Sequence, residues 1–186
     1  MRRLLVYLTS GEGGDSTVPD EEALAFMPAP QTLVEMDRYA HFHLFGTASL
    51  VILGARAYLR LGKNEEAEAT AQGGLAEAKK GPTRVECHRV LGVVAARRGD
   101  LKEAEASFLA GMEEALDTGA YLLELLCARD LKQFVVEKSQ GQAVGVVDAM
   151  ISAAAGRMNK TTADFSALLA RSAGGGSGTA PRRVAL

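Results

Sequence analysis

One stretch of the sequence occurs twice, 37 residues apart. Residues 59–69 read LRLGKNEEAEA, and residues 96–106 read ARRGDLKEAEA. The turn glycine keeps its place, so that Gly62 corresponds to Gly99, and a Glu-Ala pair follows it at the same spacing. A helical pattern with a period of roughly 20–50 residues is typical of stacked-repeat proteins, whose units bury a core by packing on one another. The repeat therefore predicts an all-α array of similar units.

Turn signals divide the chain after residue 46 into three antiparallel helical hairpins. A glycine just past the last helical residue commonly ends a helix. The pattern predicts helices over 47–61, 65–80, 84–98, 101–116, 120–138 and 142–158, with a last helical turn over 161–171. Asn64 is expected to cap the second helix, Thr83 and Glu86 to form a capping box on the third, and Asp100 to cap the fourth.

The two ends of the chain have a different character. Residues 1–19 are expected to be irregular, since the glycine-rich segment 11–16 is typical of a flexible turn or loop. This segment matches no phosphate-binding pattern. Short helices are predicted over 20–28 and 31–46, so that the helical domain spans residues 20–171. Residues 172–186 are rich in glycine and serine, which predicts a flexible tail.

Residues 48–158 resemble the tetratricopeptide repeat, whose unit is a pair of helices with small residues where the helices cross. The positions that carry the resemblance are Leu91-Gly92, Gly99-Asp100, Ala104, Phe108 and Gly111 in the second unit, Ala55, Tyr58, Gly62 and Ala67 in the first, and Ala128 and Ala143 in the third. The spacing exceeds the family's usual 34 residues, which indicates longer helices. The resemblance implies clear repeats at 48–82 and 84–119 and a weaker hairpin at 120–158, stacked as a short right-handed solenoid.

The resemblance also implies a concave groove lined by the first helix of each unit. The groove residues that it implies are Ile52, Arg56, Leu59 and Arg60, then Arg89, Val93 and Arg97, with Ser49, Glu86 and Ala96 beside them. Arginine forks pair well with carboxylates, so an acidic peptide or a C-terminal carboxylate is the expected ligand. The alternative is a solvated helix face whose arginines pair with neighbouring glutamates. Ile52 and Arg56 stand where chaperone-binding relatives carry Lys and Asn, which argues against that type of ligand.

Composition and charge exclude several other classes of protein. The 186 residues suit one domain, and a net charge of −2 provides no field that would draw the chain to nucleic acid or to an anionic membrane. RNA binding by helical repeats would need a basic concave face, which this charge does not support. The apolar run 4–8 is too short for a signal peptide or a membrane span. We therefore expect a cytoplasmic protein.

Few residues suggest chemistry. Cys87 and Cys127 lie in apolar helical contexts, where buried thiols are expected; the alternative is a small enzyme with one of them as nucleophile. His41 and His43 have no evident third ligand, so no metal or other cofactor is predicted. The sequence thus predicts a non-catalytic scaffold that binds a partner peptide or helix in its groove. The alternative is a regulatory helical segment of a larger enzyme or signalling assembly.

Overall fold

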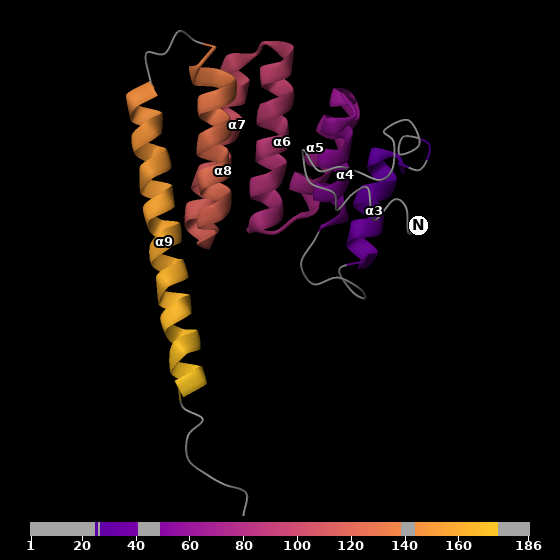
Figure 1. Cartoon of the computed structure of the whole chain (residues 1–186). Helices are drawn as coiled ribbons and strands as arrows, with labels where there is room; N and C mark the ends of the chain where they lie inside the picture. The colour runs from indigo at the N-terminus through magenta and orange to yellow at the C-terminus, as the bar shows by residue number, and fades with distance from the viewer. Residues whose placement is uncertain (1–24, 26, 41–48, 139–143, 175–186) are drawn as a thin grey trace, which may run out of the picture.

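The computed structural model describes residue 25 and residues 27–40, 49–138 and 144–174, and each regular element within them is helical. The elements are α3 (Pro30–Ala40), α4 (Leu50–Arg60), α5 (Asn64–Glu77), α6 (Pro82–Arg98), α7 (Leu101–Thr118), α8 (Tyr121–Leu131), a π-helical turn (Lys132–Val136) and α9 (Val144–Gly174). Figure 1 shows that the helices follow one another across the molecule in chain order. The prediction of an all-α stack of helical hairpins is confirmed.

The predicted turn glycines end the helices in the way the sequence suggested. Gly62, Gly99 and Gly119 have positive φ angles of 70°, 88° and 70°. Glycine adopts this left-handed conformation without the steric cost that other residues meet. The side chain of Asp100 accepts a hydrogen bond of 3.0 Å from the backbone N–H of Glu103, so this predicted cap is confirmed.

Two predicted caps are wrong. The third helix of the pattern, α6, begins at Pro82, so Thr83 lies inside its first turn and makes no cap with Glu86. Proline is favoured at the first helical position because its fixed φ suits the helix and its missing N–H needs no partner there. Asn64 is the first residue of α5 rather than its cap, and its side-chain oxygen accepts a hydrogen bond from Arg97 instead.

The C-terminal helices also differ from the prediction. Residues 120–138 form α8 followed by the π-helical turn, rather than one α-helix. The helices predicted over 142–158 and 161–171 are a single helix, α9, because no proline or glycine interrupts residues 157–173. The irregular segment 1–19, His41, His43, Ala143 and the tail beyond Gly174 lie outside the described residues.

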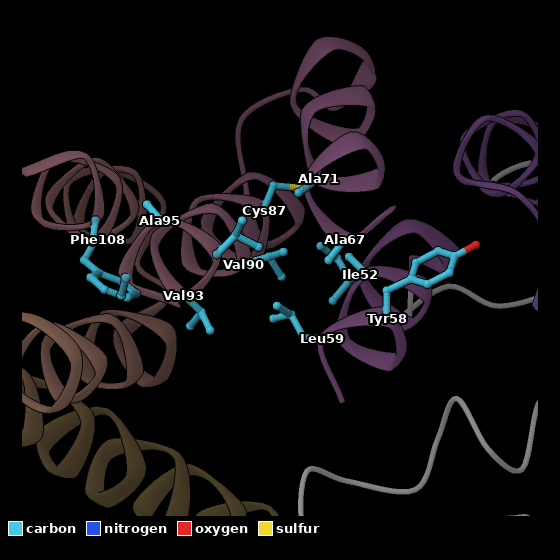
Figure 2. Packing of buried hydrophobic residues seen from close by; sticks show 14 of the residues in the cluster. Ile52, Tyr58, Leu59, Ala67, Ala71, Cys87, Val90, Val93, Ala95 and Phe108 are labelled. Atoms are coloured by element: carbon cyan, nitrogen blue, oxygen red, sulfur yellow. The ribbon is translucent and has the colours of Figure 1, made fainter. Parts of the chain in front are cut away.

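The core runs along the stack between successive helices. It includes Val51 and Ala55 of α4, Val90 of α6 and Phe108 of α7, each at most 2% exposed. Figure 2 shows Val90, Phe108 and other side chains of this cluster among the helices. At one end α3 packs on α4 and α5, and Leu33 of α3 is buried against Gly54.

At the other end, α9 packs on α8 and on the π-helical turn, and on no further helix of the described part of the chain. The carboxylate of Glu124 is buried and accepts a hydrogen bond of 3.0 Å from Nε of Arg157, while Lys132 pairs with Asp148 at 2.7 Å. These contacts fasten α9 as the last layer of the array.

Candidate partner-binding groove

A hollow of about 260 Å³ lies between the first helices of the three units. The described residues that line it are Ser49, Ile52, Leu53 and Arg56 from α4 and the residue before it, Pro82, Thr83 and Glu86 from α6, and Leu123 from α8. We call it the inter-unit hollow. Each of its walls comes from a helix that the sequence assigned to the groove-lining side of a unit.

The apolar residues predicted to line the groove are mostly part of the core. Ile52, Leu59 and Val93 are 8%, 6% and 8% exposed and belong to the main hydrophobic cluster. In Figure 2 the side chain of Leu59 lies between α4 and α6, and that of Val93 lies beside α6. Of these three residues, Ile52 also lines the inter-unit hollow.

Arg89 lies inside an ion-pair network rather than on an open surface. Its Nε is 2.6 Å from a carboxylate oxygen of Asp130 at the end of α8, and a second guanidinium nitrogen is 3.2 Å from Glu86. The residue is 8% exposed. Its positive charge is therefore balanced by two carboxylates of this chain, and the network ties α6 to α8.

Arg97 joins the first two units at their turns. One guanidinium nitrogen donates to the backbone oxygen of Leu59 at 2.7 Å and to the side-chain oxygen of Asn64 at 3.0 Å. Leu59 carries one of the last carbonyl groups of α4, which lack partners within the helix. The oxygen of Leu59 also accepts from the backbone N–H of Gly62 at 3.2 Å, so Arg97 is a second donor at the end of α4, and it remains exposed to solvent.

The other two predicted arginines are half-buried on α4. Arg56 lines the inter-unit hollow, one helical turn beyond Ile52, and Arg60 lies in the last turn of the helix. Of the four arginines, the structure therefore brings only Arg56 to the hollow.

Sequence reasoning did not include Leu53, Pro82, Thr83 or Leu123 among the groove residues. The spacing held a signal for Leu53, because positions 49, 52, 53 and 56 follow the i, i+3, i+4, i+7 pattern of one helical face. Pro82 and Thr83 were missed because α6 begins earlier than predicted. Leu123 belongs to the third hairpin, whose repeat signal is weak.

Burial shifts the pKa values of several side chains near the helix crossings. Burial raises the pKa of the Cys87 and Cys127 thiols to about 12. A thiol with such a pKa is protonated at neutral pH and is a poor nucleophile. Burial, together with the nearby positive charge of Arg84, lowers the pKa of His88. Among the described residues, no three His, Cys, Asp or Glu side chains are grouped so that they could hold a metal ion.

The arrangement of two-helix units, with first helices gathered around one hollow, is that of a helical-repeat protein, a class that commonly presents extended binding surfaces. Residues 52–72 and 85–108 match the family model of the tetratricopeptide repeat. Both matches cross the turn between the two helices of a unit, α4 to α5 and α6 to α7. These two segments are tetratricopeptide-type repeats, as the sequence repeat at a spacing of 37 residues and the small residues at the helix crossings predicted.

No curated protein and no solved structure gives a significant match to the chain. Within the described residues, no helix combines the length and the apolar character that a membrane crossing requires.

Proposed function

We propose that this protein is a non-catalytic interaction module that binds a peptide or helix of a partner protein at the inter-unit hollow. The observation that carries the proposal is that α4, α6 and α8, from three different units, meet around one hollow. Tetratricopeptide repeats generally mediate contacts between proteins, and such arrays bind along the surface formed by their stacked units. In this proposal, the other predicted groove residues support the surface around the inter-unit hollow or extend it. These residues are Leu59, Arg60, Arg89, Val93 and Arg97.

The lining of the hollow defines the chemistry of the partner. Ile52, Leu53 and Leu123 supply an apolar wall, and the volume of about 260 Å³ suits one large apolar side chain. Arg56 is the one positively charged side chain among the described lining residues, and Arg89, which does not line the hollow, pairs with Glu86 and Asp130. We therefore infer that the partner inserts an apolar side chain that lies next to a carboxylate, which pairs with Arg56.

The buried thiols indicate the cellular compartment in which this module works. Cys87 and Cys127 are both free and buried. Free cysteines are usual in reducing compartments, where disulfides are rare. We infer that the protein works in the cytoplasm.

The proposal is tested by affinity capture with the full-length protein and two variants of the hollow. Arg56→Glu reverses the charge of this side chain in the hollow, and Leu123→Arg places a cation on its apolar wall. The matched control is Leu122→Arg, because Leu122 is 55% exposed and does not line the hollow. Arg89 is not a suitable site, since charge reversal there would leave a buried network unbalanced.

We expect that partners recovered with the wild type and with Leu122→Arg are lost with both hollow variants. Thermal unfolding followed by circular dichroism checks that the variants remain folded. If folded Arg56→Glu and Leu123→Arg retain every partner, the hollow is not the binding site.

A further inference from the structure

Two leucines stand out on the outer face of α7. Leu109 is 39% exposed and Leu116 is 44% exposed. They are seven residues apart, which is about two helical turns, so both side chains lie on the same face about 10 Å apart. Neither residue lines the inter-unit hollow. The two leucines therefore form an apolar surface that is separate from the proposed groove.

The first unit shows that packing of the repeat does not require these leucines. α5 and α7 begin at corresponding residues, 37 positions apart, so Gln72 in α5 occupies the place of Leu109. Gln72 is exposed, as Leu109 is. Leu116 lies in the extra turn by which α7 extends beyond α5, and the residue 37 positions earlier is Lys79. A polar residue thus serves at both corresponding positions of the first unit.

Exposed carboxylates flank the two leucines on α7. Glu105 precedes Leu109 by one turn, and Glu113 lies between the two leucines; both glutamates are exposed. Asp117 follows Leu116, and its partner Lys80 is 3.2 Å away with both side chains more than half exposed. Such an exposed pair contributes little and is easily replaced. The leucines are therefore flanked by three carboxylates, with Lys80 beside Asp117 and the exposed Lys102 seven residues before Leu109.

We propose that the outer face of α7, formed by Glu105, Leu109, Glu113, Leu116 and Asp117, binds a lysine- or arginine-rich amphipathic helix of a partner protein. Apolar side chains of that helix cover the leucines, and its cations pair with the flanking carboxylates. A second copy of this chain is a poorer occupant. Two α7 faces packed antiparallel around Glu113 would bring this residue near its own copy, and like charges repel.

The test measures binding of a defined probe to the full-length protein by fluorescence anisotropy at low salt. The probe is a labelled helical peptide of leucine and lysine with its leucines on one face. The double variant Leu109→Gln with Leu116→Gln carries at position 109 the residue that the first unit already uses. The control is Val146→Gln, because Val146 is 65% exposed on α9, and α9 does not contact α7 within the described residues.

We expect the double leucine variant to raise the Kd of the peptide about tenfold, because two partly exposed leucines lose their apolar cover. Val146→Gln should leave the Kd unchanged. The variant Glu105→Gln with Glu113→Gln should also weaken binding, and added salt should weaken binding to the wild type.

Several results would overturn the proposal. One is an unchanged Kd for folded Leu109→Gln/Leu116→Gln, and another is an unchanged Kd for Glu105→Gln/Glu113→Gln. Equal binding of a peptide in which glutamate replaces lysine would show that charge does not select the partner. A wild-type dimer that the leucine variant abolishes, measured by light scattering, would assign the surface to a second copy instead. Arg56→Glu tests partner binding at the inter-unit hollow only, so its result is independent of the proposal for the α7 face.

Discussion

Small residues set the distance between neighbouring helices of this array. A Cβ atom on Gly74 would lie 2.8 Å from the sulfur of Cys87, and one on Gly111 would lie 3.0 Å from the sulfur of Cys127. The same glycine–cysteine contact thus occurs at both places where the second helix of a unit crosses the first helix of the next unit, α5 with α6 and α7 with α8. At the centre of the stack, a Cβ on Gly92 would lie 2.6 Å from the ring of Phe108. These side chains fit because the glycines leave room for them.

We predict that Gly92→Ala destabilises the protein by about 1–3 kcal/mol, because the new methyl group overlaps the buried Phe108 ring. Alanine favours a helix over glycine by about 1 kcal/mol, so the overlap must outweigh this gain. Gly156→Ala in α9 is the control, since a Cβ there has no atom within 4 Å. Urea unfolding measures both variants. A Gly92→Ala protein as stable as Gly156→Ala would contradict the close packing.

We predict that neither Cys87 nor Cys127 reacts with a thiol reagent in the native protein at pH 8. Both are buried, and burial raises the pKa of each thiol to about 12, so the reactive thiolate is scarce. Two thiols should react at once in urea, as a spectroscopic count with Ellman's reagent would show. Rapid labelling of the folded protein would instead revive the interpretation of a reactive cysteine.

At the scale of the elements, arginines link successive helices. Arg97 connects the end of α6 to the turn between α4 and α5, and Arg89 connects α6 to α8. A helical hairpin buries only one face by itself, so its position depends on such contacts with the next hairpin. Two arginines that the sequence assigned to partner binding therefore also hold the units in register.

We predict that Arg89→Ala costs about 3 kcal/mol or more of stability, because Glu86 and Asp130 would be left as partly buried carboxylates without their cation. Arg129→Ala on the exposed side of α8 is the matched control and should change stability little. Chemical unfolding compares the two. Equal stability of both variants would show that the Arg89 network contributes nothing net.

At the scale of the whole molecule, each helix contacts mainly its neighbours in the stack. Within the described residues, α3 contacts α4 and α5, and α9 contacts α8 and the π-helical turn, whereas α6 contacts α4, α5, α7 and α8. The central helices are therefore supported on two sides and the outer helices on one (Figure 1). Stability in such arrays depends on contacts between nearest neighbours.

This arrangement predicts a gradient of amide hydrogen exchange. We expect slow exchange in α6 and α7 and fast exchange in α3 and α9, because an outer helix can open without breaking the central contacts. Mass spectrometry of deuterium uptake would resolve the difference by peptide. Uniform protection across all helices would show a single cooperative unit instead.

The sequence by itself determined the helices and the repeat. Gly62, Gly99 and Gly119 end helices because left-handed backbone favours glycine, and Asp100 caps α7 because its side chain reaches a nearby N–H group. These are local effects, and local effects can be read from neighbouring residues. The wrong cap at Thr83 also has a local cause, because Pro82 favours the first helical position, so that α6 starts one residue before Thr83.

The tertiary structure alone decided what each groove residue does. Arg56, Arg89 and Arg97 look alike in the sequence, yet one lines the hollow, one lies among carboxylates and one donates to the end of α4. Arg97 reaches Leu59 and Asn64, which precede it by 38 and 33 residues. Arg89 reaches Asp130, 41 residues further along the chain, as well as Glu86 on its own helix. Helical periodicity fixes the face on which a residue lies, but only the packing of whole units sets which groups from distant segments meet it.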